Sequence, residues 1–96
     1  MSNDAQGEAM VREFVILNQY GIHARPAALF VKIASRYDAD IQVKKGGNTI
    51  SGKSIMGLMT LEASRGTRLS VTASGPDAEE LLDELQELIE SKFDED

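Results

Sequence analysis

Apolar residues follow two different spacings along this chain. Alternation of apolar and polar residues is typical of strands buried on one face, and recurrence at helical spacing is typical of amphipathic helices. Together with the turn residues between them, these patterns predict four strands, at residues 10–17, 38–45, 49–51 and 67–74. They also predict three helices, at residues 24–37, 54–61 and 77–93.

Turn signals between these segments indicate how the elements connect. Gly46, Gly47 and Asn48 separate two strands and tolerate the positive φ of a hairpin turn. Asp77, with Glu80 three residues later, predicts the start of the last helix. The order β-α-β-β-α-β-α predicts an α+β fold. We expect a two-layer open-faced sandwich, in which a four-stranded antiparallel sheet carries three helices on one face.

The apolar faces of the first and last predicted helices identify a candidate core. On the first helix this face comprises Ala27, Phe30, Val31, Ala34 and Tyr37. On the last helix it comprises Leu81, Leu82, Leu85, Leu88, Ile89 and Phe93. Both faces follow the spacing of about 100° per residue that places side chains on one side of a helix.

The chain length of 96 residues suits one domain. Residues 10–93 contain every predicted element and should form that single domain. Residues 1–9 are polar, and we expect them to form a short mobile leader. Residues 94–96 are Asp94, Glu95 and Asp96, which we expect to form a solvated acidic tail.

Composition narrows the possible functions. The chain has no cysteine and one histidine, so we expect neither a disulfide framework nor a metal site, and no cofactor. Its formal net charge of −6 disfavours binding to nucleic acid or to anionic lipid. No apolar run approaches the length that spans a membrane, and the first residues lack the apolar stretch of a signal peptide. We therefore expect a cytoplasmic protein.

The strongest candidate for chemistry is His23, which lies at the junction between a loop and the first predicted helix. Free N–H groups at a helix start favour an anion, and a neutral imidazole there could attack a phosphoryl group. Arg25, two residues later, has a planar guanidinium that fits phosphate oxygens. The alternative is that His23 only covers the loop and that Arg25 is merely solvated.

Several apolar residues fall on outward helix faces and indicate a docking surface. Leu29 is predicted to lie far from the core face of the first helix, among cationic residues. Ile55, Met56 and Met59 are predicted to face outward on the short second helix, and exposed patches of this kind suggest partners. The alternatives are that Leu29 is an isolated exposed leucine and that the other three lie under a loop as a satellite of the core.

Two stretches of the sequence resemble a known family. Residues 21–28, Gly-Ile-His-Ala-Arg-Pro-Ala-Ala, are similar to the active-site signature of HPr, the histidine phosphocarrier of the bacterial phosphotransferase system. Residues 52–59, Gly-Lys-Ser-Ile-Met-Gly-Leu-Met, are similar to the regulatory serine region of that family. The resemblance extends over residues 11–93, which is nearly the whole chain.

The resemblance implies roles for individual residues. His23 matches the histidine that Enzyme I phosphorylates on Nδ1, drawing on phosphoenolpyruvate. Arg25 matches the arginine that stabilises the phosphohistidine, and Ser54 matches the serine that an HPr kinase/phosphorylase modifies in many relatives. The positions that face Enzyme I and the IIA acceptor domains match Ala24, Ala28, Leu29, Ile55, Met56 and Met59.

Three questions stay open at this point. The segments at 73–76 and 91–96 look closer to the nitrogen-related branch of the family, often called NPr, whereas residues 52–57 are similar to kinase-regulated sugar carriers. Tyr20 stands in the loop before His23, where many relatives carry a small polar residue, and the sequence does not indicate how it affects the site. A regulatory binding module controlled at Ser54 is the alternative to a phosphocarrier.

An enzyme is disfavoured by the single His23 and the absence of cysteine. A monomer is expected because transfer needs a free His23 face.

Overall fold

A computed structural model describes residues 9–95 of the chain. The leader predicted at residues 1–9 lies outside the described residues except for Ala9, which already belongs to the first strand. The elements follow the predicted order: β1 (Ala9–Val15), α1 (Ala24–Ala34), β2 (Asp40–Lys45), β3 (Asn48–Ser51), α2 (Ile55–Thr60), β4 (Arg68–Ser74) and α3 (Ala78–Glu90). A short 3₁₀ turn, η2 (Lys92–Asp94), follows α3.

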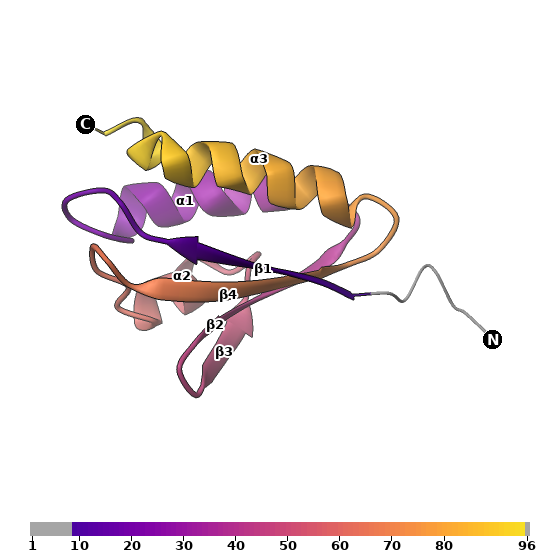
Figure 1. The fold of residues 1–96 in the computed structure, drawn as a ribbon, viewed down its shortest axis with the longest axis horizontal. Coiled ribbons are helices and arrows are strands. Elements are labelled where there is room, and N and C mark those ends of the chain that lie inside the picture. The colour runs from indigo at the N-terminus through magenta and orange to yellow at the C-terminus, as the bar shows by residue number, and fades with distance from the viewer. Residues whose placement is uncertain (1–8, 96) are drawn as a thin grey trace.

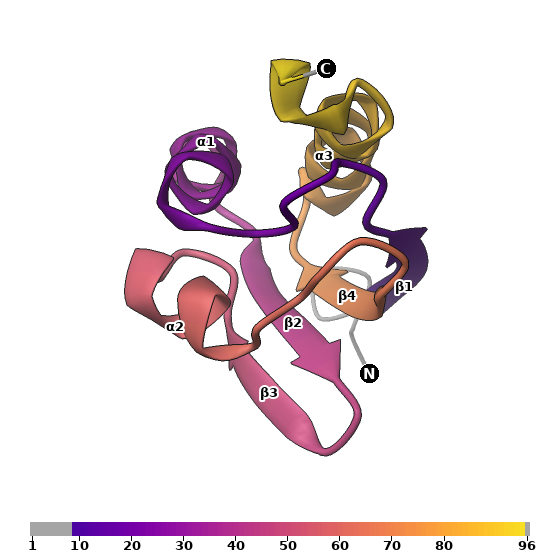
Figure 2. The same ribbon diagram turned by 90° about the vertical axis from the view of Figure 1, so that its left-hand side faces the viewer.

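The four strands form one antiparallel sheet in the order β1-β4-β2-β3. β4 is central and pairs with β1 from Ala9 opposite Ser74 and with β2 from Asp40 opposite Ser74. Figures 1 and 2 show α1 and α3 packed side by side over the sheet, with α2 beside β2 and β3. The predicted two-layer α+β sandwich is confirmed.

The candidate core is largely confirmed. Ala27, Phe30 and Ala34 of α1 are buried, and so is the whole predicted apolar stripe of the last helix through Phe93. Val31 and Tyr37 are half-buried and pack against this core. The first helix ends at Ala34 rather than at residue 37, because the amides of Arg36 and Tyr37 donate three residues back and tighten the last turn.

The starts of α2 and α3 differ in how they are held. Ser54 caps α2, since its Oγ accepts a hydrogen bond from the Gly57 amide at 2.9 Å. Asp77 stands at the N-cap of α3, but its side chain makes no capping bond. Its carboxylate instead accepts the amides of Asp38 and Ala39, both at 2.9 Å, and so ties the turn before β2 to the start of α3.

Across residues 9–95, no helix has both the length and the apolar character needed to cross a membrane. The same residues hold no group of three or more histidine, cysteine, aspartate or glutamate side chains arranged to bind a metal ion.

Candidate functional site

His23 is the N-cap residue of α1, with an extended backbone and a side chain that is 44% exposed. Its carbonyl accepts the Ala27 amide at 3.0 Å, which closes the first turn of the helix. The amides of Ala24 and Arg25 lie in this first turn, where no intrahelical acceptor exists, and the turn contains no acidic residue. The helix start therefore presents positive potential beside the imidazole.

The loop before His23 is held by buried contacts. Asn18 is fully buried, and its Nδ2 donates to the Gly21 carbonyl at 2.8 Å. Ile22 donates from its amide to the Ala63 carbonyl at 2.8 Å. Gly21 has a φ of +68°, and a Cβ there would lie 2.3 Å from the same Ala63 oxygen. The chain thus needs glycine at this position to bring His23 to the helix start.

Glu95 reaches the imidazole from the C-terminal segment. Its Oε2 lies 2.8 Å from Nε2 of His23, and its Oε1 accepts Nδ2 of Asn18 at 2.9 Å. Only 15% of the Glu95 side chain is exposed. The prediction of a solvated acidic tail is therefore wrong for Glu95, while Asp96 lies outside the described residues.

The hydrogen bond from Asn18 lowers the pKa of the Glu95 carboxyl below its ordinary value, although burial opposes this shift. The contacts with His23 and the charge of Arg25 lower this pKa further. Glu95 is accordingly an ionised carboxylate at neutral pH, placed directly on a ring nitrogen.

Arg25 also contacts the C-terminal segment. Its Nη1 donates to the Phe93 carbonyl at 3.1 Å and lies 3.7 Å from Oε2 of Glu95. More than half of the Arg25 side chain is exposed, so the guanidinium can reorient without disturbing the core. The structure brings His23 and Arg25 together, as predicted, and adds Asn18 and Glu95, which sequence reasoning missed.

One signal pointed toward these missed residues. Phe93 continues the apolar stripe of α3, and its burial obliges the next residues to lie near the body of the domain. The direction they take is set by left-handed backbone angles at Lys92, Phe93 and Asp94, with φ of 57°, 55° and 58°. Residues other than glycine rarely adopt this conformation, so the sequence alone does not predict the turn.

The predicted outward residues of α2 are exposed. Ile55, Met56 and Met59 are 41%, 73% and 40% exposed, and Ser54 at the start of the helix is half-buried. They are therefore not a satellite of the core. Figures 1 and 2 show that the start of α1, α2 and the C-terminal segment lie at the same end of the molecule.

On α1 the prediction is right in part. Ala24 and Ala28 are exposed, but Leu29 is half-buried and packs against the core. The prediction that Leu29 lies far from the core is wrong, since its side chain packs against the core cluster, and α1 also packs against α2. Single-helix geometry takes no account of this second neighbour.

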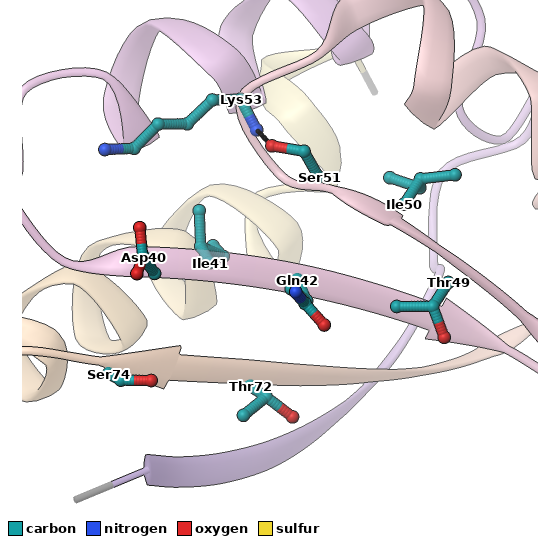
Figure 3. A pocket seen from close by; sticks show the side chains of 9 residues that line it. All are labelled: Asp40, Ile41, Gln42, Thr49, Ile50, Ser51, Lys53, Thr72 and Ser74. Atoms are coloured by element: carbon teal, nitrogen blue, oxygen red, sulfur yellow. Dashed lines mark hydrogen bonds between the residues drawn. The ribbon is translucent and has the colours of Figure 1, made fainter. Parts of the chain in front are cut away.

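A polar cavity lies elsewhere, on the sheet face that the helices leave open. Figure 3 shows its lining side chains, which come from β2, β3, the end of β4 and Lys53. It is lined by Asp40, Ile41, Gln42, Thr49, Ile50, Ser51, Lys53, Thr72 and Ser74. None of the predicted site residues belongs to it, so the reactive groups lie on an exposed end of the molecule rather than in this hollow.

Comparison with known proteins agrees with this geometry. The family model for the PTS HPr component phosphorylation site matches residues 10–91. Phosphocarrier protein HPr of Treponema pallidum is 39% identical over 87 residues, which cover 91% of this chain and 99% of the relative. A crystal structure of HPr from Thermoanaerobacter tengcongensis has a TM-score of 0.87 and 45% identity, covering 91% of this chain and 98% of that one.

The HPr-like protein Crh of Bacillus subtilis is a further relative. It is 43% identical over 72 residues, which cover 75% of this chain and 85% of Crh. One of its solved structures, with a TM-score of 0.66, is described as a dimer. The sequence matches and the shared fold place the chain in the HPr family, the phosphocarrier proteins of the phosphotransferase system, which carry phosphoryl groups rather than act as enzymes.

Proposed function

We propose that His23 is the residue that carries the phosphoryl group and that Nδ1 is the atom that accepts it. The observation that supports this assignment is the contact between Nε2 and Glu95, which occupies one ring nitrogen. Within residues 9–95 no hydrogen bond engages the other nitrogen, Nδ1. The imidazole is also exposed, so a donor protein can reach it.

Arg25 and the first turn of α1 are proposed to hold the phosphate once it is formed. The guanidinium and the imidazole both approach Oε2 of Glu95, and within residues 9–95 the polar partners of the guanidinium are this carboxylate and the Phe93 carbonyl. Its planar donors fit phosphate oxygens in pairs. The free amides of Ala24 and Arg25 add positive potential at the same end of the helix.

The partners proposed for this reaction are phosphorylated Enzyme I as donor and IIA-type domains as acceptors, in sugar uptake or in nitrogen-related regulation. We assign their docking surface to residues around His23 that are all exposed except the half-buried Leu29. Met56 is the most exposed of the three apolar residues of α2, and methionine side chains adapt to different partners. The surface comprises Ala24, Ala28, Leu29, Ile55, Met56 and Met59.

Ser54 is proposed as a regulatory phosphorylation site for a kinase of the HPr kinase/phosphorylase type. A phosphate on its Oγ would carry about −2 charge beside the apolar patch of α2 and would oppose docking of Enzyme I. Ser54→Glu should therefore slow phosphorylation of His23 in a timed Enzyme I assay, whereas Thr49→Glu, which adds the same charge on the open sheet face, should not. Equal rates for the two variants would contradict this role.

We further propose that the protein acts in the cytoplasm and as a monomer, since transfer requires the His23 end to be free. The dimer described for Crh makes the second point testable. Size-exclusion chromatography with light scattering across a range of concentrations should give the monomer mass.

The test of the central assignment is incubation with Enzyme I and phosphoenolpyruvate, followed by intact mass measurement. The wild type should gain one acid-labile phosphoryl group, and His23→Ala should gain none. Arg25→Ala should gain it more slowly, because the product phosphate loses its bidentate partner. A gain that persists in His23→Ala would overturn the assignment. No gain in the wild type, with a known HPr phosphorylated in parallel, would favour a regulatory module controlled at Ser54.

A further inference from the structure

The C-terminal segment has a backbone conformation that requires an explanation. After α3 ends at Glu90, three consecutive residues, Lys92, Phe93 and Asp94, adopt left-handed φ angles. This region is unfavourable for residues with a side chain, and such strain persists only where the surroundings enforce it. Here Phe93 supplies the anchor, because its ring is fully buried. The result of the turn is to direct Glu95 back across the start of α1.

Both oxygens of the Glu95 carboxylate have hydrogen-bond partners, Asn18 on one side and His23 on the other. Asn18 donates from Nδ2 to Oε1 and also to the Gly21 carbonyl, so both of its amide hydrogens have acceptors. Turning the Asn18 amide over would place its oxygen against two other oxygens, so this orientation is fixed. Glu95 is therefore held from one side by a buried group while its second oxygen meets His23.

This contact determines which ring nitrogen carries the proton. An ionised carboxylate only accepts hydrogen bonds, so the neutral imidazole must donate from Nε2. The lone pair is then on Nδ1, the atom proposed above to attack phosphorus. A carboxylate on the far nitrogen of an imidazole also fixes the orientation of the ring and stabilises the positive charge it gains on reaction.

We propose that Glu95 is a positioning residue for phosphoryl transfer: it holds His23 in the Nε2–H tautomer and compensates the charge that develops on the ring. This inference rests on His23 being the acceptor. In the step, a P–N bond forms at Nδ1 while the bond between phosphorus and the donor protein breaks and its electron pair returns to the donor. Nε2 keeps its proton throughout, directed at Glu95.

The same contact allows the opposite effect, which makes the proposal testable. A carboxylate near the site also repels an incoming phosphoryl group, and the C-terminal segment occupies Arg25 through the Phe93 carbonyl. If repulsion dominates, removing the charge of Glu95 speeds transfer. If positioning dominates, removing it slows transfer. Arg25 lies 3.7 Å from the carboxylate and offsets part of its charge, which favours positioning.

The experiment compares Glu95→Gln and Glu95→Ala with Asp94→Asn in rapid-quench phosphorylation by phospho-Enzyme I. Asp94→Asn is the matched control, because it removes one charge from the same segment and asparagine tolerates left-handed φ. Asp94 is exposed, and the hydrogen bond and ion pair of the His23 side chain within residues 9–95 are made with Glu95 rather than with Asp94. We expect the transfer step to slow about 10-fold in both Glu95 variants and to change less than about 2-fold in Asp94→Asn. An unchanged or faster step in Glu95→Gln would overturn the proposal.

A second measurement needs no partner protein. ¹⁵N NMR of the His23 ring at about pH 8, where imidazole is neutral, should show protonated Nε2 in the wild type and in Asp94→Asn. In Glu95→Ala the two ring shifts should move toward those of a tautomer mixture. Unchanged shifts would show that Glu95 does not act on the ring. If instead the wild type is not phosphorylated at His23, the proposed function fails, and the NMR result still reports on the contact.

Discussion

Asp77 connects two parts of the fold that are far apart in the sequence. Its replacement by alanine tests how much that connection contributes to the free energy of unfolding. Its two carboxylate oxygens accept the amides of Asp38 and Ala39, each at 2.9 Å. These bonds hold the turn between α1 and β2 against the start of α3. Asp77→Ala removes both acceptors and leaves the side-chain space to water.

The expected magnitude follows from where each amide lies. Hydrogen bonds to charged groups contribute roughly 1.5–3 kcal/mol each. Asp38 is exposed, so its amide regains a bond to water, whereas Ala39 is buried and regains one less easily. Loss of a negative charge at the N-cap of α3 adds about 0.3–1 kcal/mol. We expect the free energy of unfolding to fall by about 3 kcal/mol in total, which lowers Tm by about 12–24 °C in a domain of this size.

The assay is urea and thermal unfolding followed by circular dichroism. Glu79→Gln serves as the control, because it removes a charge from the first turn of the same helix. Asp77→Asn should fall between the control and Asp77→Ala, since its amide retains one acceptor oxygen. A loss in Asp77→Ala within about 0.5 kcal/mol of the control would refute the reasoning, because it would mean that water replaces both bonds.

Two further predictions concern the loop before α1 and the alkaline limit of stability. In urea unfolding, Gly21→Ala should lower the free energy of unfolding by about 1–3 kcal/mol more than Gly46→Ala. Both glycines have left-handed φ, but only a Cβ at position 21 would meet the Ala63 carbonyl. Equal losses in the two variants would contradict this. The hydrogen bond to Glu84, with burial, raises the pKa of Tyr37 to about 12. The stability that the neutral Tyr37 hydroxyl contributes is complete below about pH 10 and disappears as pH rises toward 12. Tyr37→Phe should therefore lose less stability than the wild type between these pH values. Parallel curves of stability against pH for the two proteins would exclude the effect.

The spacing of apolar residues was sufficient to predict the sheet, the helices and most of the core. Leu69, Val71 and Ala73, which alternate with polar residues along β4, are all buried, and so are Leu58 of α2 and its C-cap residue Leu61. These features depend on a period within one element, which a sequence displays directly. For the same reason the position of His23 at a helix start could be predicted.

The errors arise where one element meets another. The carboxylate of Asp77 is engaged by a distant turn, although its spacing to Glu80 is typical of a cap within one helix. Leu29 is half-buried against the core, although the periodicity of its own helix places it on the outward side. Glu95 reaches His23 through a left-handed turn that is enforced by burial of Phe93. Each depends on tertiary contacts, which override local preference.

The contact between Glu95 and the start of α1 also makes the site a product of complete folding. Of the residues that meet there, Glu95 lies 77 positions from Asn18 and 72 positions from His23 along the chain. Closing a loop of that length costs entropy that only the finished sheet and helix layer can offset. A chain that has formed α1 but not yet docked its last turn would present His23 without its neighbour. The ring environment of His23 should therefore report the last stage of folding, even though His23 itself is near the beginning of the chain.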